Sequence, residues 1–346
     1  MGLECLRVAP EYYKFVLHIV GGLSVPINLL GIYLVMSHTP KNSSYKYCQL
    51  YMQLVTLFVE LHMSWTCPGF YYFPLLGGIN TNDFMKNYIP THASVIIYFF
   101  LFAFELPSIL LCFIYRNESV SEMDMDMKIP KFVTYFILSS SHTFPFVLVL
   151  CILKAKLTNE QTIDSLTTYY PTCLHLLDVP GFIAYDWRIN YYTIGVGICL
   201  VSYICFFYSY ALFIAIRTIK ILRKMRQHLS PATYKMQITA IVTLILQCVC
   251  PFVFVCMPLC IIIYVVVFDA VEYTALATNT MFMITAHSMM STIIMIACNT
   301  TYREWVTSTF FKILCCDKLG PNSIMGEPIE STVKSTNHPG RPRKTI

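Results

Sequence analysis

The chain has 346 residues, of which 56% are hydrophobic and only 12% are charged, and its mean hydropathy is +0.59. This composition excludes an ordinary soluble domain and predicts an integral membrane protein. The formal net charge of +5 does not indicate a nucleic-acid partner, because no groove-reading motif accompanies the basic residues.

Seven apolar runs are long enough to cross a hydrocarbon core of about 30 Å at about 1.5 Å per helical residue. They cover residues 13–36, 47–73, 91–115, 132–153, 191–216, 238–268 and 275–298. Strands of a β-barrel would be about half as long and would alternate strictly, which these runs do not. The sequence therefore predicts an all-α membrane protein with a bundle of seven transmembrane helices.

Lys and Arg residues are distributed unequally between the two sides of this bundle, with 18 on one side and 6 on the other. The excess is concentrated in residues 217–235, and it places the N-terminus outside and the C-terminus in the cytoplasm. We therefore expect an extracellular N-terminus (1–12), a membrane domain (13–298), a juxtamembrane amphipathic helix (299–319) and a disordered cytoplasmic tail (320–346).

Three glycosylation sequons oppose this topology, because Asn42, Asn117 and Asn299 all fall on the predicted cytoplasmic side. A pattern this short is expected about two or three times by chance in such a length, and we interpret the sequons as fortuitous. A glycan on Asn42 would reverse the topology.

Several polar and aromatic side chains lie within the spans. An ionisable group at membrane depth costs at least about 2.5 to 3.5 kcal/mol, so it must face protein or water and find a partner. We assign to a ligand pocket the residues Trp65, Glu105, His142 and His287. Asn28 and Glu60 are assigned to activation, and their depth predicts a hydrogen bond between them. For any one of these residues, a purely structural interhelical hydrogen bond is the simpler interpretation.

Prolines in the third and sixth spans are candidates for bends. Pro107 follows Glu105 and predicts a kink in the third helix. Pro251 and Pro258 in the sixth span are assigned to activation as a hinge, although two static bends are equally consistent with the sequence.

Most of the fifteen cysteines lie within spans, but Cys5 and Cys173 fall in outer segments. A bridge between them would tie the N-terminus to the long loop 154–190; unpaired thiols and a pairing with Cys67 are the alternatives. The loop itself mixes aromatic residues, Pro and Asp, which favours a folded lid and an amphipathic loop on the membrane about equally.

After the last span, residues 302–316 read "YREWVTSTFFKILCC" and predict a short helix on the inner leaflet. Cys315 and Cys316 at its end are candidate acylation sites, and free thiols are the alternative. The chain contains no phosphate-binding loop, dinucleotide fingerprint, zinc-protease motif or serine elbow, so neither an enzyme nor a cofactor or metal site is expected.

Five stretches resemble one family: "YYKFVLHIVGGLSVPINLLGIYLV", "TPKNSSYKYCQLYMQ", "CPGFYYFPLLGG", "YYPTC" and "AHSMMSTIIMIACNTTYREW". They are similar to nematode seven-transmembrane chemosensory receptors of serpentine receptor class I, or the related class H. The resemblance implies a G-protein-coupled receptor in the plasma membrane of sensory cilia. Its implied partners are an odorant or pheromone-like molecule and a heterotrimeric G protein.

The resemblance also implies roles for particular residues. Tyr115 and Arg116 stand where rhodopsin-like receptors have an Asp/Glu-Arg-Tyr motif, and Tyr302 with Arg303 replaces their Asn-Pro-x-x-Tyr ending. We therefore assign all four to activation and G-protein coupling. An odorant-gated cation channel of inverted topology is the alternative, and the distribution of basic residues argues against it.

Overall fold

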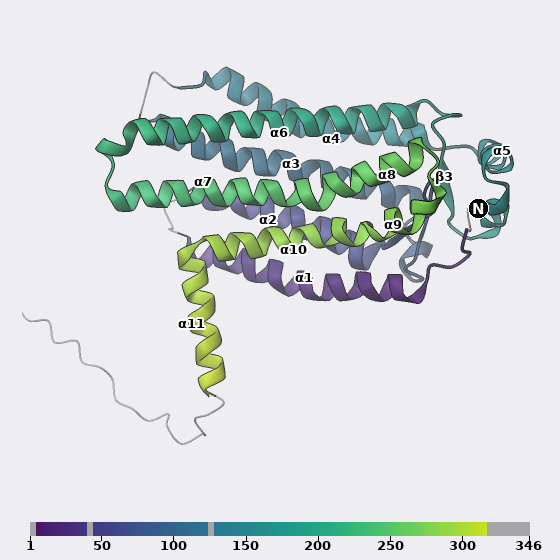
Figure 1. The fold of residues 1–346 in the computed structure, drawn as a ribbon, viewed down its shortest axis with the longest axis horizontal. Helices are drawn as coiled ribbons and strands as arrows, with labels where there is room; N and C mark the ends of the chain where they lie inside the picture. Colours follow the sequence, from purple (N-terminus) through teal and green to yellow (C-terminus); the bar gives the residue numbers. More distant parts are fainter. Residues whose placement is uncertain (1–4, 40–43, 124–127, 317–346) are drawn as a thin grey trace, which may run out of the picture. The chain divides into compact units, whose positions relative to one another are not determined.

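The computed structural model describes residues 5–39, 44–123 and 128–316, with side chains described up to residue 312. Each of the seven predicted spans contains a helical segment (Figure 1). In chain order the segments are α1 (Glu11–His38), α2 (Tyr45–Leu61), α3 (Thr91–Ser121), α4 (Lys131–Ala155), α6 (Tyr192–Lys224), α7 (Pro231–Pro251) with α8 (Met257–Val267), and α9 (Thr274–Asn279) with α10 (Met281–Cys298). Among the described residues, six helical segments are long and apolar enough to cross a membrane by composition, and α2 is the shorter seventh.

The second span ends earlier than the sequence predicted. Helix α2 has 17 residues and continues as one π-helical turn, His62–Thr66. These two segments together reach about 33 Å at 1.5 Å per residue, which is enough to span a hydrocarbon core. The chain then leaves the helix at Cys67, where Pro68 and Gly69 follow, so the predicted extension to residue 73 was wrong.

Within this helical fold, a small antiparallel sheet closes the end of the bundle where the N-terminus lies (Figure 1). Its strands are β1 (Gly69–Tyr71), β2 (Leu76–Asn80) and β3 (Ile183–Tyr185), with β2 in the middle. A side chain at Gly78 would place its Cβ 2.9 Å from the carbonyl oxygen of Phe70, so only glycine allows β1 and β2 to approach.

The loop 154–190, for which the sequence left a folded lid and an amphipathic loop open, is folded. It contains α5 (Asn159–Tyr169), a 3-10 helix (Pro171–Asp178) and β3, which joins it to the hairpin of the preceding loop. Thr158 and Gln161 form a capping box that starts α5. We call residues 67–90 and 156–191 the cap, and the end of the bundle that they cover the cap end.

Two large apolar clusters fill much of the described bundle interior, and a smaller one lies around Val120 and Ile221. The cluster near the cap includes Phe102 on α3 and Ile284 on α10, whereas the second begins at Leu106 on α3 and includes Phe207 on α6. Between these clusters the buried positions on α3 and α10 are polar. Helix α3 is central, because it packs against α2, α4, α6 and α7.

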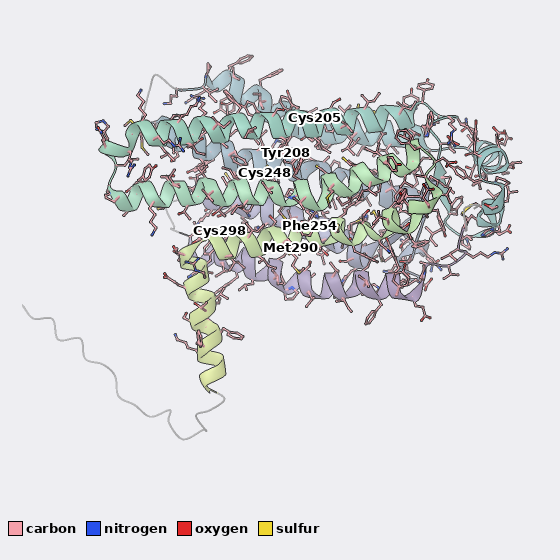
Figure 2. All side chains as sticks on the ribbon, in the orientation of Figure 1. Cys205, Tyr208, Cys248, Phe254, Met290 and Cys298 are labelled. Atoms are coloured by element: carbon pink, nitrogen blue, oxygen red, sulfur yellow. A yellow bond between two sulfur atoms is a disulfide. The ribbon has the colours of Figure 1, made fainter. Side chains whose placement is uncertain are left out.

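Large apolar side chains project outward from the bundle (Figure 2). Exposed examples include Phe15, Leu23, Phe132, Phe206 and Leu212. Water would penalise such a surface, whereas lipid tails solvate it. The exterior is thus suited to the hydrocarbon core of a bilayer.

The last helix, α11 (Thr300–Cys316), confirms a helix after the seventh span. Its Phe310 and Phe311 are exposed. Residues 317–346 and Asn42 lie outside the described residues, so the tail, the membrane contact of α11 and the sequon at Asn42 stay predictions.

Candidate functional site

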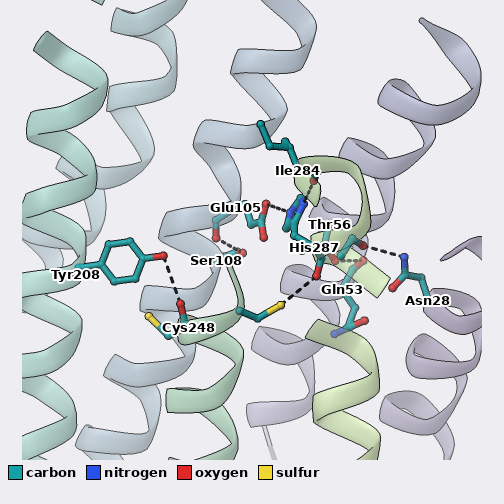
Figure 3. A network of polar contacts seen from close by, with 11 residues as sticks. Asn28, Gln53, Thr56, Glu105, Ser108, Tyr208, Cys248, Ile284 and His287 are labelled. Atoms are coloured by element: carbon teal, nitrogen blue, oxygen red, sulfur yellow. Dashed lines mark hydrogen bonds and ion pairs between the residues drawn. The ribbon is translucent and has the colours of Figure 1, made fainter. Parts of the chain in front are cut away.

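A buried pair of ionisable groups connects α3 to α10 in the middle of the bundle (Figure 3). Glu105 Oε2 lies 2.9 Å from His287 Nε2, and both side chains are at most 2% exposed. The other ring nitrogen, Nδ1, lies 2.5 Å from the carbonyl oxygen of Ile284. A carbonyl oxygen only accepts, so Nδ1 carries a proton, and a second proton lies between Nε2 and the carboxyl group. Glu105 and His287 therefore share one proton in a charge-assisted bond.

A second carboxyl group lies beside this pair. Glu60 on α2 is 1% exposed, and within the described part of the chain neither of its oxygens has a hydrogen-bond partner. The polar groups around it are the hydroxyls of Ser24 and Ser64 and the imidazole of His287. Ser64 donates instead to the backbone oxygen of Glu60, at 2.6 Å. Two carboxyl groups thus lie around one imidazole, and neutrality of this cluster requires a proton on one of the carboxyl groups.

Asn28 does not bond to Glu60, which corrects the predicted contact. Its Nδ2 donates to Ser288 Oγ at 2.8 Å, and its Oδ1 accepts from Thr292 Oγ1 at 2.6 Å. The Thr292 hydroxyl also lies 2.9 Å from Gln53 Oε1 on α2. This chain of bonds joins α1, α2 and α10, and the absence of a side chain at Gly31 lets α1 approach Thr292.

Sequence reasoning missed Gln53 and Thr292 as members of this network. Both are polar residues inside predicted spans, which was the available signal. We call the buried set formed by Asn28, Gln53, Glu60, Glu105, His287, Ser288 and Thr292 the polar layer.

Trp65 and His142, also predicted for a ligand pocket, are placed elsewhere. Trp65 is 49% exposed, and its indole lies against Gly21 on α1. His142 bonds through Nδ1 to the carbonyl oxygen of Leu138 in its own helix and stacks on Tyr51 at 6.0 Å between ring centroids. Within the described residues, no hydrogen bond joins Trp65 or His142 to the polar layer.

The sixth helical segment meets the polar layer where it is interrupted. Helix α7 ends at Pro251, a π-helical turn covers Phe252–Cys256, and Pro258 lies in the first turn of α8. Just before the interruption, Cys250 Sγ donates to the carbonyl oxygen of His287 at 3.4 Å. Two residues earlier on α7, the carbonyl oxygen of Cys248 accepts a hydrogen bond from the hydroxyl of Tyr208 on α6 at 3.3 Å (Figure 3). The proline-containing helix is therefore attached to His287 at its irregular point.

An aromatic and cationic cluster lies at the opposite end of the bundle. The guanidinium of Arg116 lies 3.7 Å from the centroid of the Tyr45 ring, and its Nη1 donates to Gln237 Oε1 at 3.5 Å. Tyr115 packs against Tyr45 at 5.8 Å between centroids. Tyr302 shares a 2.6 Å hydrogen bond with Thr39. Arg116 and Tyr302, assigned to activation from sequence, thus occupy the same end, and Tyr45 is the partner that sequence reasoning missed.

Two further residues named in the sequence analysis, Arg303 and Asn117, also form hydrogen bonds. Arg303 donates from Nη1 to the carbonyl oxygen of Ala297 at 3.0 Å, next to the end of α10. Asn117, which begins the second sequon, is 2% exposed and donates to Thr218 at 2.9 Å. A glycan has no room at Asn117 in this fold.

A disulfide joins Cys5 to Cys173, the pair that the sequence favoured, with 5.3 Å between the Cα atoms. Next to it, His175 Nε2 donates to the carbonyl oxygen of Cys5 at 2.6 Å. The third candidate, Cys67, is a buried free thiol. Cys315 and Cys316 end α11, but their side chains lie outside the described residues, so acylation stays a prediction.

The comparisons with known proteins agree with this arrangement. The family model described as "Serpentine type 7TM GPCR chemoreceptor Sri" matches residues 3–306. The chain belongs to the Sri family of serpentine chemoreceptors. This family is class I of the two classes that the sequence resembled, and it makes the receptor a multi-pass membrane protein.

The receptor also has the fold of a solved protein of the same general architecture. It is similar to the crystal structure of squid rhodopsin, with a TM-score of 0.56 and 13% identity over 89% of this chain and 88% of that one. At this identity the likeness establishes the seven-helix fold alone. No curated protein sequence matches the receptor significantly.

Proposed function

We propose that the receptor detects a small environmental molecule, of odorant or pheromone type, and activates a heterotrimeric G protein at the opposite end of the bundle. The observation that carries the proposal is the Glu105–His287 pair, which is the buried charged link between α3 and α10. Because Cys250 holds the interrupted helix to the same histidine, a change at this pair reaches the proline hinge directly.

The ligand-binding region in this proposal is the half of the bundle between the cap and the polar layer. Its interior is aromatic: Tyr98 stacks on Phe102 at 6.0 Å on α3, and Tyr13 packs against Phe282 at 4.8 Å between α1 and α10. Such a region suits a small apolar or aromatic molecule with one or two polar groups. We therefore place the ligand above Glu105 and His287, beneath the cap.

Activation follows as a population shift. A ligand that binds one arrangement of the helices more tightly than the other favours that arrangement by its differential affinity. In the active arrangement, the Glu105–His287 bond changes, and the part of α7 before Pro251 swings outward. That movement separates Gln237 on α7 from Arg116 on α3, which frees the guanidinium for the G protein.

The G-protein surface in this proposal combines Arg116 with the basic residues that end α6 and follow it. These include Arg217, Lys220, Arg223 and Lys224. The proposed topology places them in the cytoplasm, where Lys and Arg are enriched, and places the disulfide-linked cap outside, where disulfides persist. We further propose that the receptor resides in the plasma membrane of sensory cilia.

Two experiments test the proposal without a known ligand. Epitope tags after Gly2 and after Ser230 report topology in intact and permeabilised cells. We expect the first tag to be visible on intact cells and the second only after permeabilisation. The reverse pattern would discard G-protein coupling at this face and favour the channel of inverted topology.

The second experiment measures basal nucleotide exchange on a reconstituted heterotrimeric G protein. Glu105→Gln weakens the charged link, and we expect basal exchange to rise, by about tenfold for each 1.4 kcal/mol of population shift. Adding Arg116→Gln should remove that rise at equal surface expression. Glu272→Gln is the matched control, because Glu272 is exposed in the segment before α9. Exchange that is equal in all four proteins would refute the proposal.

A further inference from the structure

A cavity of about 250 Å³ opens at the cap end, outside the helical interior. Three segments that are distant in sequence form its walls: residues 7–14, residues 79–86 and residues 175–180. The Cys5–Cys173 disulfide holds the first and third walls together, since Cys5 and Cys173 each lie two residues before the start of a wall. The cavity is small for a drug-sized ligand but large enough for a molecule of several heavy atoms.

The cavity contains an excess of positive charge. Arg7, Lys14 and Lys86 line it together with Asp83 and Asp178. Lys86 already pairs with Asp83 at 2.7 Å, and this bond together with the nearby charges of Lys86 and Lys14 lowers the pKa of Asp83. The remaining ionisable groups are Arg7, Lys14 and the exposed carboxylate of Asp178, together with His175, whose Nε2 donates to the carbonyl oxygen of Cys5.

Asn80 adds a hydrogen-bond donor to this lining. It is 7% exposed, and its Oδ1 accepts from the backbone N–H of Asn82 at 2.9 Å. Its Nδ2 is buried, and the side-chain group beside it within the described residues is the thiol of Cys67, a weak acceptor. A carboxylate oxygen is a stronger acceptor than a thiol, so a carboxylate in the cavity would compete for this donor.

We propose that this cavity binds a small soluble carboxylate, with Arg7 and Lys14 as its charge partners and Asn80 as its amide donor. Charge-assisted bonds from cationic groups to a carboxylate are stronger than bonds between neutral groups, so the anion is the ligand that this lining distinguishes best. The site is separate from the proposed ligand region between the helices, and its occupancy depends on the disulfide that joins its walls.

The experiment compares three probes of similar shape and different charge: benzoate, benzamide and benzylammonium. Each is titrated onto the full-length receptor in neutral phosphatidylcholine nanodiscs, and binding is followed by saturation-transfer NMR. We expect benzoate to bind more tightly than the other two. In the double variant Arg7→Gln with Lys14→Gln, benzoate affinity should fall about tenfold or more while benzamide affinity is unchanged.

Lys154→Gln is the matched control, because Lys154 is an exposed lysine at the end of α4 and does not line the cavity. Arg7 is exposed and Lys14 half-buried, so their replacement leaves the core intact. The double variant Cys5→Ser with Cys173→Ser should also lose benzoate binding.

Three results would overturn the proposal. Equal binding of benzoate and benzamide would mean that the cavity recognises the aromatic ring and not the charge. Tighter binding of benzylammonium would mean that the carboxylates of the lining determine the selectivity. Loss of benzoate binding in a second set of nanodiscs that contains phosphatidylserine would make a lipid headgroup the occupant. Because no G protein takes part, failure here leaves the proposed signalling function intact, and failure of signalling leaves this site intact.

Discussion

The cap and the polar layer are held together by different kinds of bonds. The cap uses strand pairing, a capping box and one disulfide, so its geometry is fixed by the backbone and by a covalent link. The polar layer links α1, α2, α3 and α10 through side-chain hydrogen bonds, including the one between Glu105 and His287. Side-chain bonds in a buried layer have alternative partners, here Glu60 for His287. We therefore expect the cap to keep its geometry while the polar layer exchanges hydrogen-bond partners.

The largest loss of stability should come from removing one member of the buried Glu105–His287 pair. Glu105→Leu removes the carboxyl group that pairs with His287, which should destabilise the fold by about 3 to 5 kcal/mol. The double variant Glu105→Leu with His287→Leu should recover most of that loss, since neither member of the pair is then left without the other. Thermal unfolding in nanodiscs measures both. A double variant that is less stable than Glu105→Leu alone would show that the pair itself stabilises the fold.

Loss of the Cys5–Cys173 disulfide should loosen the cap and leave the helices folded. Removing the disulfide with Cys173→Ser should reduce stability by about 2 to 4 kcal/mol, mostly through greater freedom of the unfolded chain. Limited proteolysis should then cut the cap while the helices stay protected. Cys205→Ser is a suitable control, because Cys205 is an exposed free thiol on α6 (Figure 2). Cleavage at equal rates in Cys173→Ser and the control would show that the sheet alone holds the cap.

At the opposite end of the bundle, the stacking of Arg116 on Tyr45 should have an intermediate effect. Tyr45→Leu keeps an apolar side chain but removes the ring, and it should weaken the closed arrangement by about 1 kcal/mol. Basal nucleotide exchange on the G protein should rise by several-fold. Tyr47→Leu provides the comparison, since Tyr47 is 60% exposed on the same helix. A fall in exchange after Tyr45→Leu would mean that the stacking supports the active arrangement.

The sequence determined the helical spans well, because hydropathy over a window of about twenty residues depends only on composition. It failed at the end of the second span. There the residues that form β1 are Gly or aromatic, so they prolonged the hydrophobic run. Pro68 and the Gly77–Gly78 pair were the signals for a hairpin.

The candidate site was predicted residue by residue but not as a network. Glu105 and His287 stood out because ionisable groups are rare in lipid, yet their pairing depends on the rotation of α3 and α10 about their axes. Asn28 was assigned the wrong partner for the same reason, since depth along a helix is readable from sequence and helix rotation is not. Tyr45 was overlooked because an aromatic residue at the edge of a predicted span gives no specific signal.

The smallest effect should come from the neutral part of the polar layer, and it tests whether that layer rearranges as one unit. Asn28→Ala removes the bonds to Ser288 and Thr292, and interhelical hydrogen bonds in membranes contribute only about 0.6 kcal/mol on average. A double-mutant cycle of Asn28→Ala with Ser288→Ala isolates their coupling through thermal unfolding. If the layer acts as a unit, basal nucleotide exchange in the Glu105→Gln protein should change further when Asn28→Ala is added. Exchange that is unchanged by this addition would assign rearrangement to the charged pair alone and leave the bonds of Asn28 as static links between α1 and α10.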